Sequence, residues 1–247
     1  MSVIYEPRGR AREYCELAVN LYRGCGHGCK YCYAPAATRT DREKFYREPA
    51  PRKDIIERLG RDARDYGLKF RGPVLLCFTS DPYQPINDDH DLAGQAIRIL
   101  RGNGFRVEVL TKGGRRAEKD LHLLGAGDKI GATLTFISDE DSREWEPDAA
   151  LPAERFALLK KAKSTGLSTW ASLEPVIDPE QSLEIIRRTH EFVDIFKVGV
   201  LNHHPRAKEI DWYQFGTKAV ELLDELRCSY YIKDDLRKHM EQARLFA

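Results

Sequence analysis

Residues 20–35 read NLYRGCGHGCKYCYAP, and this stretch places three of the chain's six cysteines within eight residues. Cys25, Cys29 and Cys32 follow the spacing C-x3-C-x2-C. Thiolates are soft ligands that suit iron–sulfur clusters or zinc, and the neighbouring glycines let the loop curl so that the sulfurs converge. A structural zinc site takes four ligands, whereas a 4Fe–4S cluster held by three cysteines leaves one iron open. The stretch therefore predicts a metal centre, and we favour such a cluster over zinc held by the same cysteines and His27.

Short apolar runs recur along the chain and alternate with segments of helical periodicity. Several runs, such as VLLCF at 74–78 and FKVGVL at 196–201, are almost wholly apolar. Strands buried on both faces have this composition, and parallel sheets flanked by helices require it. The predicted strands are residues 16–22, 74–79, 106–111, 130–136, 168–173 and 195–200, with a last short strand at 228–232.

The segments between these strands carry apolar residues at helical spacing and end near glycines. The predicted helices are residues 53–66, 91–101, 118–124, 152–164, 180–191, 212–226 and 234–243. Six repeats of strand then helix imply right-handed crossovers. The predicted fold class is therefore α/β, a partial (β/α)6 TIM-like barrel with a C-terminal strand and helix extension.

Polar motifs follow the predicted strands, at the end of the barrel where such folds place their chemistry. RGCGHGCKYC follows the first strand and SDPYQP the second. KGG follows the third strand, EPVIDP the fifth and NHHP the sixth. We expect these motifs to surround one site.

Composition and charge narrow the class of protein. Hydrophobic residues make up 42% of the chain and charged residues 32%, which is ordinary for a globular protein, and the net charge is +1. Residues 1–53 carry eleven Lys/Arg against six Asp/Glu, which suits an anionic substrate or a solvated surface strip. No segment has the length and apolar character of a membrane span or a signal peptide. We therefore expect a cytoplasmic protein whose cysteines bind metal rather than form disulfides.

The cysteine motif, with Tyr31 before its third cysteine, resembles the C-x3-C-x-aromatic-C hallmark of the radical S-adenosylmethionine (SAM) superfamily. In that family the open iron binds the amino and carboxylate groups of SAM. The reduced cluster then cleaves SAM to a 5′-deoxyadenosyl radical, which abstracts hydrogen from a substrate. NLYRGCGHGCKYCYAP, CFTSDPYQP and the pair Thr111-Lys112 are similar to the spore photoproduct lyase group. The resemblance implies a 4Fe–4S cluster and SAM as cofactors.

The resemblance also implies residues that contact SAM. Ser80 and Asp81 would meet the SAM amino group, because a hydroxyl or carboxylate orients an ammonium. Lys112 would pair with the SAM carboxylate, and Glu174 would bind the ribose hydroxyls. The other expected contacts are Tyr31, Thr133, Thr135, Val198 and Leu201. For the two threonines, ordinary strand propensity is an equally good explanation.

The chain departs from spore photoproduct lyase at one position. That lyase has a hydrogen-donating cysteine directly before Thr-Ser-Asp, where this chain has Phe78, and the cysteine here is Cys77. An offset of one residue turns a strand side chain to the opposite face. We therefore expect Cys77 to be a buried core thiol, and we do not predict thymine-dimer repair.

Four residues near strand ends are candidates for substrate chemistry, although each alone is more often structural. They are Lys112, Asn202, Tyr231 and Lys233.

The sequence therefore predicts a radical SAM enzyme that cleaves SAM and abstracts hydrogen from an unidentified substrate, with a nucleic acid, a nucleotide or another anion as the candidates. The expected partner is a flavodoxin-like or ferredoxin-like one-electron reductant, and no membrane is expected. Three alternatives stay open: a radical SAM enzyme that modifies a peptide or protein, a nucleic-acid-binding module with a structural metal site or an inert cluster, and a redox sensor that uses exposed cluster thiols. The predicted regions are an N-terminal basic extension (1–15), the radical SAM core barrel (16–204) and a C-terminal extension (205–247).

Overall fold

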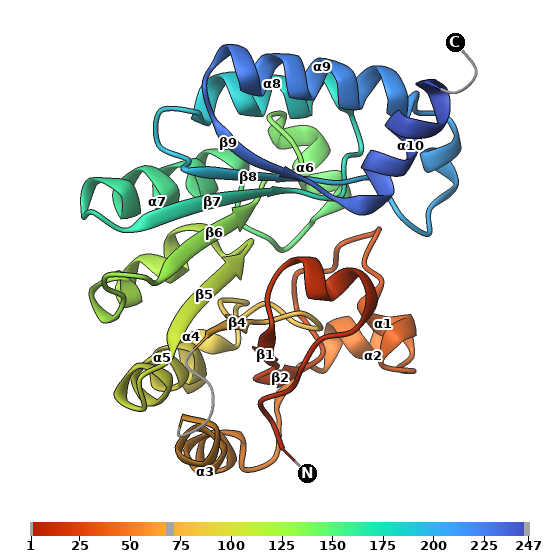
Figure 1. Cartoon of the computed structure of the whole chain (residues 1–247). Helices are drawn as coiled ribbons and strands as arrows, with labels where there is room; N and C mark the ends of the chain where they lie inside the picture. The colour runs from red at the N-terminus through yellow and green to blue at the C-terminus, as the bar shows by residue number, and fades with distance from the viewer. Residues whose placement is uncertain (1, 68–71, 245–247) are drawn as a thin grey trace.

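The computed structural model describes residues 2–67 and 72–244 and shows a curved, seven-stranded sheet with helices along its outer face (Figure 1). The strand order is β1-β4-β5-β6-β7-β8-β9, and all six pairings are parallel. The strands are β1 (Leu17–Val19), β4 (Pro73–Leu76), β5 (Arg106–Thr111), β6 (Lys129–Thr133), β7 (Ser168–Leu173), β8 (Ile195–Val198) and β9 (Ser229–Ile232). This confirms the predicted α/β class and partial barrel, and the predicted last strand, β9, continues the same sheet.

Helices carry the chain back between successive parallel strands, as such strands require. The larger ones are α3 (Ile55–Gly67), α5 (Leu92–Gly102), the 3₁₀ helix η2 (Gly114–Leu123), α7 (Pro152–Ser164), α8 (Pro179–Thr189), α9 (Trp212–Glu225) and α10 (Asp234–Arg244). The short ones are η1 (Gly9–Glu13), α1 (Ala34–Ala37), α2 (Arg42–Arg47), α4 (Asn87–His90), α6 (Asp139–Trp145) and η3 (Pro205–Lys208). Among the described residues, no helix combines the length and apolar character needed to cross a bilayer.

The strands predicted at 74–79 and 130–136 end three residues earlier, at Leu76 and Thr133, and two further predicted elements differ from the structure in kind. The first predicted strand divides after Val19, and Tyr22–Arg23 (β2) pairs antiparallel with Ala50–Pro51 (β3) instead. The side chain of Asn20 accepts hydrogen bonds from the backbone N–H groups of Phe78 and Thr79, at 2.9 Å each, so the chain turns towards the loop after β4. The helix predicted at 118–124 belongs to the longer 3₁₀ helix η2.

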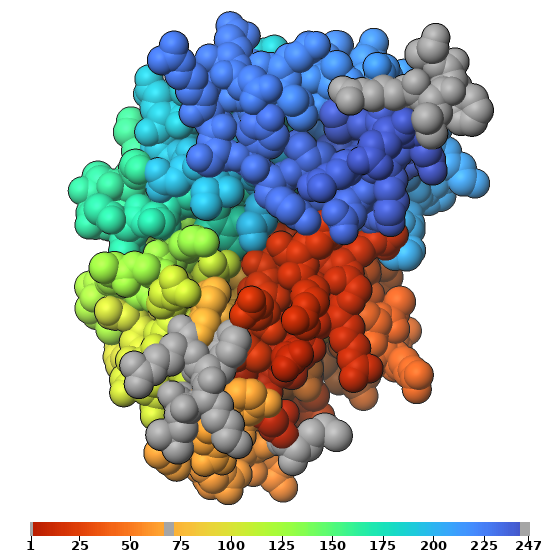
Figure 2. All heavy atoms as spheres, in the orientation of Figure 1, coloured from red at the N-terminus to blue at the C-terminus, as the bar shows by residue number. Residues whose placement is uncertain are grey.

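The N-terminal strap, defined here as residues 2–14, crosses the gap between the two edge strands, β1 and β9. On the β1 side, Tyr5 forms an antiparallel bridge with Ala18. On the β9 side, Oε1 of Glu13 accepts hydrogen bonds from the backbone N–H of Asp234 at 2.8 Å and the hydroxyl of Tyr231 at 3.2 Å. Figure 2 shows the red N-terminal atoms in contact with the dark blue atoms of α10. The strap therefore covers the opening of the partial barrel.

Candidate functional site

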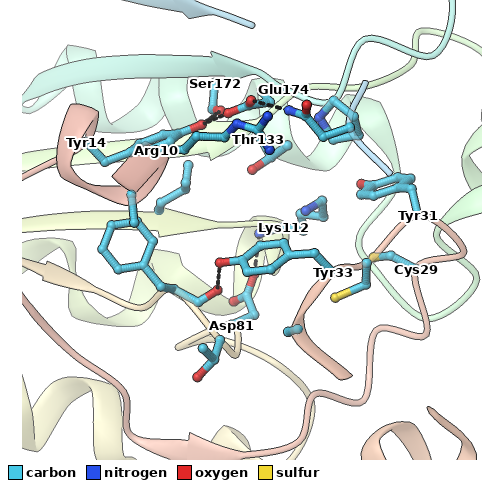
Figure 3. A pocket seen from close by; sticks show the side chains of 18 of the residues that line it. Arg10, Tyr14, Cys29, Tyr31, Tyr33, Asp81, Lys112, Thr133, Ser172 and Glu174 are labelled. Carbon is cyan, nitrogen blue, oxygen red and sulfur yellow. Dashed lines mark hydrogen bonds between the residues drawn. The ribbon is translucent and has the colours of Figure 1, made fainter. Parts of the chain in front are cut away.

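A cavity of about 570 Å³ lies at the carboxyl ends of the strands (Figure 3). Its walls come from the N-terminal strap, the cysteine loop and the segments that follow β4 to β9. Most of the predicted site residues line it: Cys25, Cys29, Tyr31, Cys32, Ser80, Asp81, Lys112, Thr133, Glu174, Leu201, Asn202 and Lys233. The topology therefore brings together side chains that lie more than 200 residues apart in the sequence.

Three predicted site residues lie outside this lining. Thr135 is buried, and its hydroxyl donates a 3.0 Å hydrogen bond to Glu146. Val198 is buried in the apolar core on β8. Tyr231 donates to Glu13 and lines a separate groove between β9 and α10.

Hydrogen bonds with α2 hold part of the cysteine loop, residues 24–32. Gly24 has a φ of +77°, and a Cβ there would stand 2.5 Å from the carbonyl oxygen of Phe45, so only glycine fits. The backbone N–H of Cys25 donates to that same carbonyl at 3.0 Å. The carbonyl of Cys29 accepts from the Tyr46 hydroxyl at 2.8 Å and from Arg42 at 3.2 Å. The loop is therefore a fixed platform with its cysteines along one cavity wall.

The three cysteines of the loop are free thiols. Burial raises the pKa of Cys29 to about 12 and that of Cys25 further still, although backbone hydrogen bonds from His27 and Asp81 act in the opposite direction on Cys25. Metal binding must therefore release protons from these thiols. Within the described chain, no three His, Cys, Asp or Glu side chains stand close enough to share one metal ion. A cluster does not require this, because its cysteines bind separate irons.

Asp81 joins the end of β4 to the end of β5. Its Oδ1 accepts from the hydroxyl of Thr111 at 2.6 Å and from the backbone N–H of Tyr83 at 2.8 Å. Its Oδ2 accepts from the backbone N–H of Lys112 at 2.6 Å. Both carboxylate oxygens are thus engaged by the protein, and one of these bonds fixes the backbone from which Lys112 extends.

Lys112 contributes a positive charge to the cavity. Burial alone would lower its pKa, but Cys29 and Glu146 raise it above the usual value, so the amine is an ammonium. The Nζ atom stands 5.5 Å from the centre of the Tyr31 ring, at cation–π distance. An anionic ligand group beside the cysteine loop would meet this ammonium.

His27 is buried, with only 1% exposure. Burial lowers its pKa to about 4, and the imidazole is therefore neutral. Nδ1 stands 3.6 Å from Oδ2 of Asp81. Three buried polar atoms of the cavity wall, His27 Nε2, Thr79 Oγ1 and Ser80 Oγ, make no hydrogen bond of standard geometry with the described residues. Buried polar groups are normally paired, so these atoms point to a ligand.

The far wall of the cavity, away from the cysteine loop, is a cluster of side chains. Sequence analysis predicted only some of its members. Lys233, 3% exposed, forms an ion pair with Glu174 and has its Nζ 4.3 Å from the centre of the Tyr14 ring. Tyr14 donates to Glu174 at 2.7 Å and contacts Ser172 at 3.0 Å (Figure 3). Arg10, also from the strap, lines the cavity as well. The sequence shows that this N-terminal segment is basic, but basic character alone does not predict that the strap forms part of the site.

Cys77 is buried, as expected, with 5% exposure in an apolar cluster, and burial raises its pKa to about 12. The sequence predicts that Cys77 and Phe78 point to opposite faces of a strand, but both residues border the cavity. Strand β4 ends at Leu76, so strand alternation no longer applies to them.

The family model of the radical SAM superfamily matches residues 19–193. This chain belongs to the radical SAM superfamily. The 4Fe–4S cluster and SAM are the cofactors that this membership and SAM-bound structural neighbours imply. The cavity fits them: three free thiols on one loop, a neighbouring ammonium and the unpaired buried atoms all belong to its lining.

Relatives of this radical SAM chain occur in distant organisms. An uncharacterized protein of Mycobacterium tuberculosis is 27% identical over 168 residues, which are 64% of this chain and 49% of that protein. An uncharacterized protein of Methanocaldococcus jannaschii is 23% identical over 189 residues, 76% of this chain and 71% of that one. The chain thus spans about half the length of the mycobacterial relatives it matches.

Solved radical SAM structures share the fold. A spore photoproduct lyase variant with bound SAM and dinucleoside spore photoproduct aligns with a TM-score of 0.72 at 14% identity, covering 93% of this chain and 79% of the lyase. SuiB of Streptococcus suis bound to SAM aligns with a TM-score of 0.63 at 12% identity, covering 87% of this chain and 49% of SuiB. At these identities the alignments establish the fold.

Proposed function

We propose that this enzyme binds a 4Fe–4S cluster through Cys25, Cys29 and Cys32 and positions SAM and a substrate in the cavity. When bound, these cofactors would supply the chemistry, which is reductive cleavage of SAM coupled to hydrogen abstraction from the substrate. The observation that carries the proposal is that three free thiols and the Lys112 ammonium line one cavity.

The methionine end of SAM would lie beside the cysteine loop. Lys112 pairs with its carboxylate, an anion that suits a fixed ammonium. Ser80, which lines the cavity, meets the amino group. Asp81 adds negative charge near that group and holds the Lys112 backbone through its 2.6 Å hydrogen bond.

The adenosine end would lie towards the far wall. Glu174 is the proposed contact for the ribose hydroxyls, with Lys233 and Tyr14 fixing the carboxylate. Tyr31, Thr133 and Leu201 line the space between. Thr135 and Val198 lie behind this lining and would act through the residues they support.

The N-terminal strap restricts the access of water to the cavity, which protects a reactive radical. At the mouth, Arg8 and Arg10 are exposed and also line the cavity. Arg10 forms an ion pair with Asp235, and the charge of Arg8 supports an anionic substrate such as a nucleic acid or nucleotide. Asn202 and Lys233 are substrate-side candidates that line the cavity, and Tyr231 lies outside it. A flavodoxin-like or ferredoxin-like protein in the cytoplasm would supply the electron.

An anaerobic assay of 5′-deoxyadenosine tests the proposed function. The chain is reconstituted with iron and sulfide, reduced with dithionite and given SAM. Deoxyadenosine should form with the wild type and with the control Cys228→Ala, whose cysteine lies outside the cavity lining. It should be absent with Cys29→Ala. Equal yields from all three proteins, or none from a fully reduced wild-type cluster, would overturn the proposal.

A further inference from the structure

A buried ion pair lies behind the cysteine loop, and the proposed function does not use it. Nη2 of Arg155 is 2.5 Å from Oε2 of Glu146, and their side chains are only 2% and 0% exposed. Removing two charges from water is costly, and apolar residues often replace such pairs without loss of stability. The pair therefore needs an explanation other than general stability.

The Glu146 carboxylate holds the cysteine loop from behind. Its Oε1 accepts a hydrogen bond from the hydroxyl of Tyr31, which stands between Cys29 and Cys32 in the sequence. The adjacent residue, Trp145, accepts a 2.8 Å hydrogen bond from the backbone N–H of Lys30. The end of α6 is thus fastened to the segment between two of the proposed cluster ligands.

The Arg155 guanidinium fixes the other side of the site. It donates to the carbonyl of Thr133 at 3.0 Å and to the carbonyl of Ala150 at 2.8 Å. The backbone N–H of Ala150 in turn donates to the carbonyl of Lys112 at 2.9 Å. The guanidinium therefore connects the end of β6 to the backbone that carries the cavity ammonium.

The charges around Glu146 also support a role in holding the site together. Burial would raise the pKa of Glu146, but Arg155 and Lys112 lower it below its usual value, so the carboxylate is ionised. It compensates the buried Arg155 guanidinium and attracts the half-buried Lys112 ammonium, so removing it would leave both cations without this counter-charge.

We infer that Glu146 and Arg155 are positioning residues for the cluster and for SAM, an inference that rests on the proposed function. The carboxylate sets the place of the Tyr31 phenol and thereby of Cys29 and Cys32. The guanidinium sets the place of the Lys112 backbone. The pair also sets the charge that the cluster experiences.

The test compares Glu146→Gln, the double variant Glu146→Gln/Arg155→Met and Tyr31→Phe with the wild type. Glu108→Gln is the matched control, because Glu108 is also a buried carboxylate, but its side chain is paired with Lys129 at 2.9 Å rather than with a residue of the cysteine loop. After anaerobic reconstitution, the reduction potential is measured by electron paramagnetic resonance (EPR) titration and the SAM Kd by equilibrium dialysis.

The variants should separate charge from geometry. Glu146→Gln should raise the potential, because two cations lose their counter-charge, and should weaken SAM binding about tenfold, as loss of a supporting contact at a metal site typically does. The double variant should return the potential towards the wild-type value while SAM binding stays weak. Tyr31→Phe keeps every charge, so SAM binding should weaken with little change in potential. Glu108→Gln should leave both quantities near wild type.

Failure of this inference can be distinguished from failure of the proposed function. Wild-type potential and SAM affinity in Glu146→Gln and Tyr31→Phe, or equal changes in Glu108→Gln, would overturn the inference alone. A wild-type chain that assembles no cluster would overturn the inference together with the proposed function. If Glu146→Gln fails to fold, the double variant and Tyr31→Phe still decide the question.

Discussion

The hydroxyl of Tyr14 donates a 2.7 Å hydrogen bond to Oε2 of Glu174, which joins the N-terminal strap to the segment that follows β7. Lys233 forms an ion pair with the same carboxylate oxygen. The barrel is open between β1 and β9, so this contact completes a cavity wall that the sheet does not provide. The strap is therefore part of the site as well as a cover for the sheet edges.

Loss of this contact should destabilise the fold. Tyr14→Phe removes a hydrogen bond to a charged acceptor, and the free energy of unfolding should fall by about 2 kcal/mol. The matched control is Tyr230→Phe, which removes a 2.9 Å hydrogen bond to Asp224 at the surface and should cost no more than about 0.5 kcal/mol. Urea unfolding measures both values, and equal losses would contradict a structural role for the strap.

The stability that the strap gains from its contact with Asp62 should depend on pH. Partial burial would raise the pKa of Asp62, but hydrogen bonds from Ser2 and the backbone N–H groups of Val3 and Ile4 lower it below 3.8. A carboxyl with a lowered folded-state pKa stabilises the fold above its unfolded pKa and loses this effect as pH falls through the folded value.

Asp62→Asn should therefore be less stable than the wild type at neutral pH, and the difference should shrink below about pH 3.8. Urea unfolding of the metal-free chain from about pH 6 to about pH 3 measures the change. A difference that stays constant over this range would show that the strap is anchored without the ionised carboxylate.

Five of the six cysteines should divide into two groups in their effect on iron content. Replacing Cys25, Cys29 or Cys32 with alanine should abolish a stable cluster, because each removal leaves only two of the three proposed cysteine ligands. Cys15→Ala and Cys228→Ala should keep full iron and sulfide content after anaerobic reconstitution. Iron loss in the second group but not the first would place the metal elsewhere.

Lys112 should matter for SAM more than a neighbouring surface lysine does. Lys112→Met removes a charge-assisted contact worth about 2 kcal/mol, so the SAM Kd should rise roughly 30-fold. Lys30→Met is the control, because Lys30 lies in the cysteine loop but pairs with Glu144 at the surface. Equal Kd values for the two variants would remove Lys112 from the proposed site.

Much of the fold and part of the site could be predicted from sequence, because each depends on local pattern. Apolar runs mark buried parallel strands, and parallel strands bring their carboxyl ends to one edge. That rule alone gathers the cysteine loop, Ser80, Lys112 and Glu174. It is less reliable beyond a strand end: β6 stops at Thr133, so Thr135 turns away from the cavity.

The parts that sequence reasoning missed depend on tertiary contacts between residues with no common pattern. Tyr14 reaches the cavity only because the strap crosses the gap between β1 and β9. Glu146 and Arg155 occupy different elements, and their types suggest surface positions. Only the packed structure shows that they are buried together behind Tyr31.

The central claim is that SAM binds at the cluster in this cavity, and EPR of the reduced cluster with and without SAM tests it most directly. Because we place SAM beside the cysteine loop that would hold the cluster, adding SAM should change the spectrum of the reduced wild-type cluster. The change should require a higher SAM concentration in Lys112→Met. An identical spectrum at saturating SAM, in a chain shown to carry a full reduced cluster, would contradict the account.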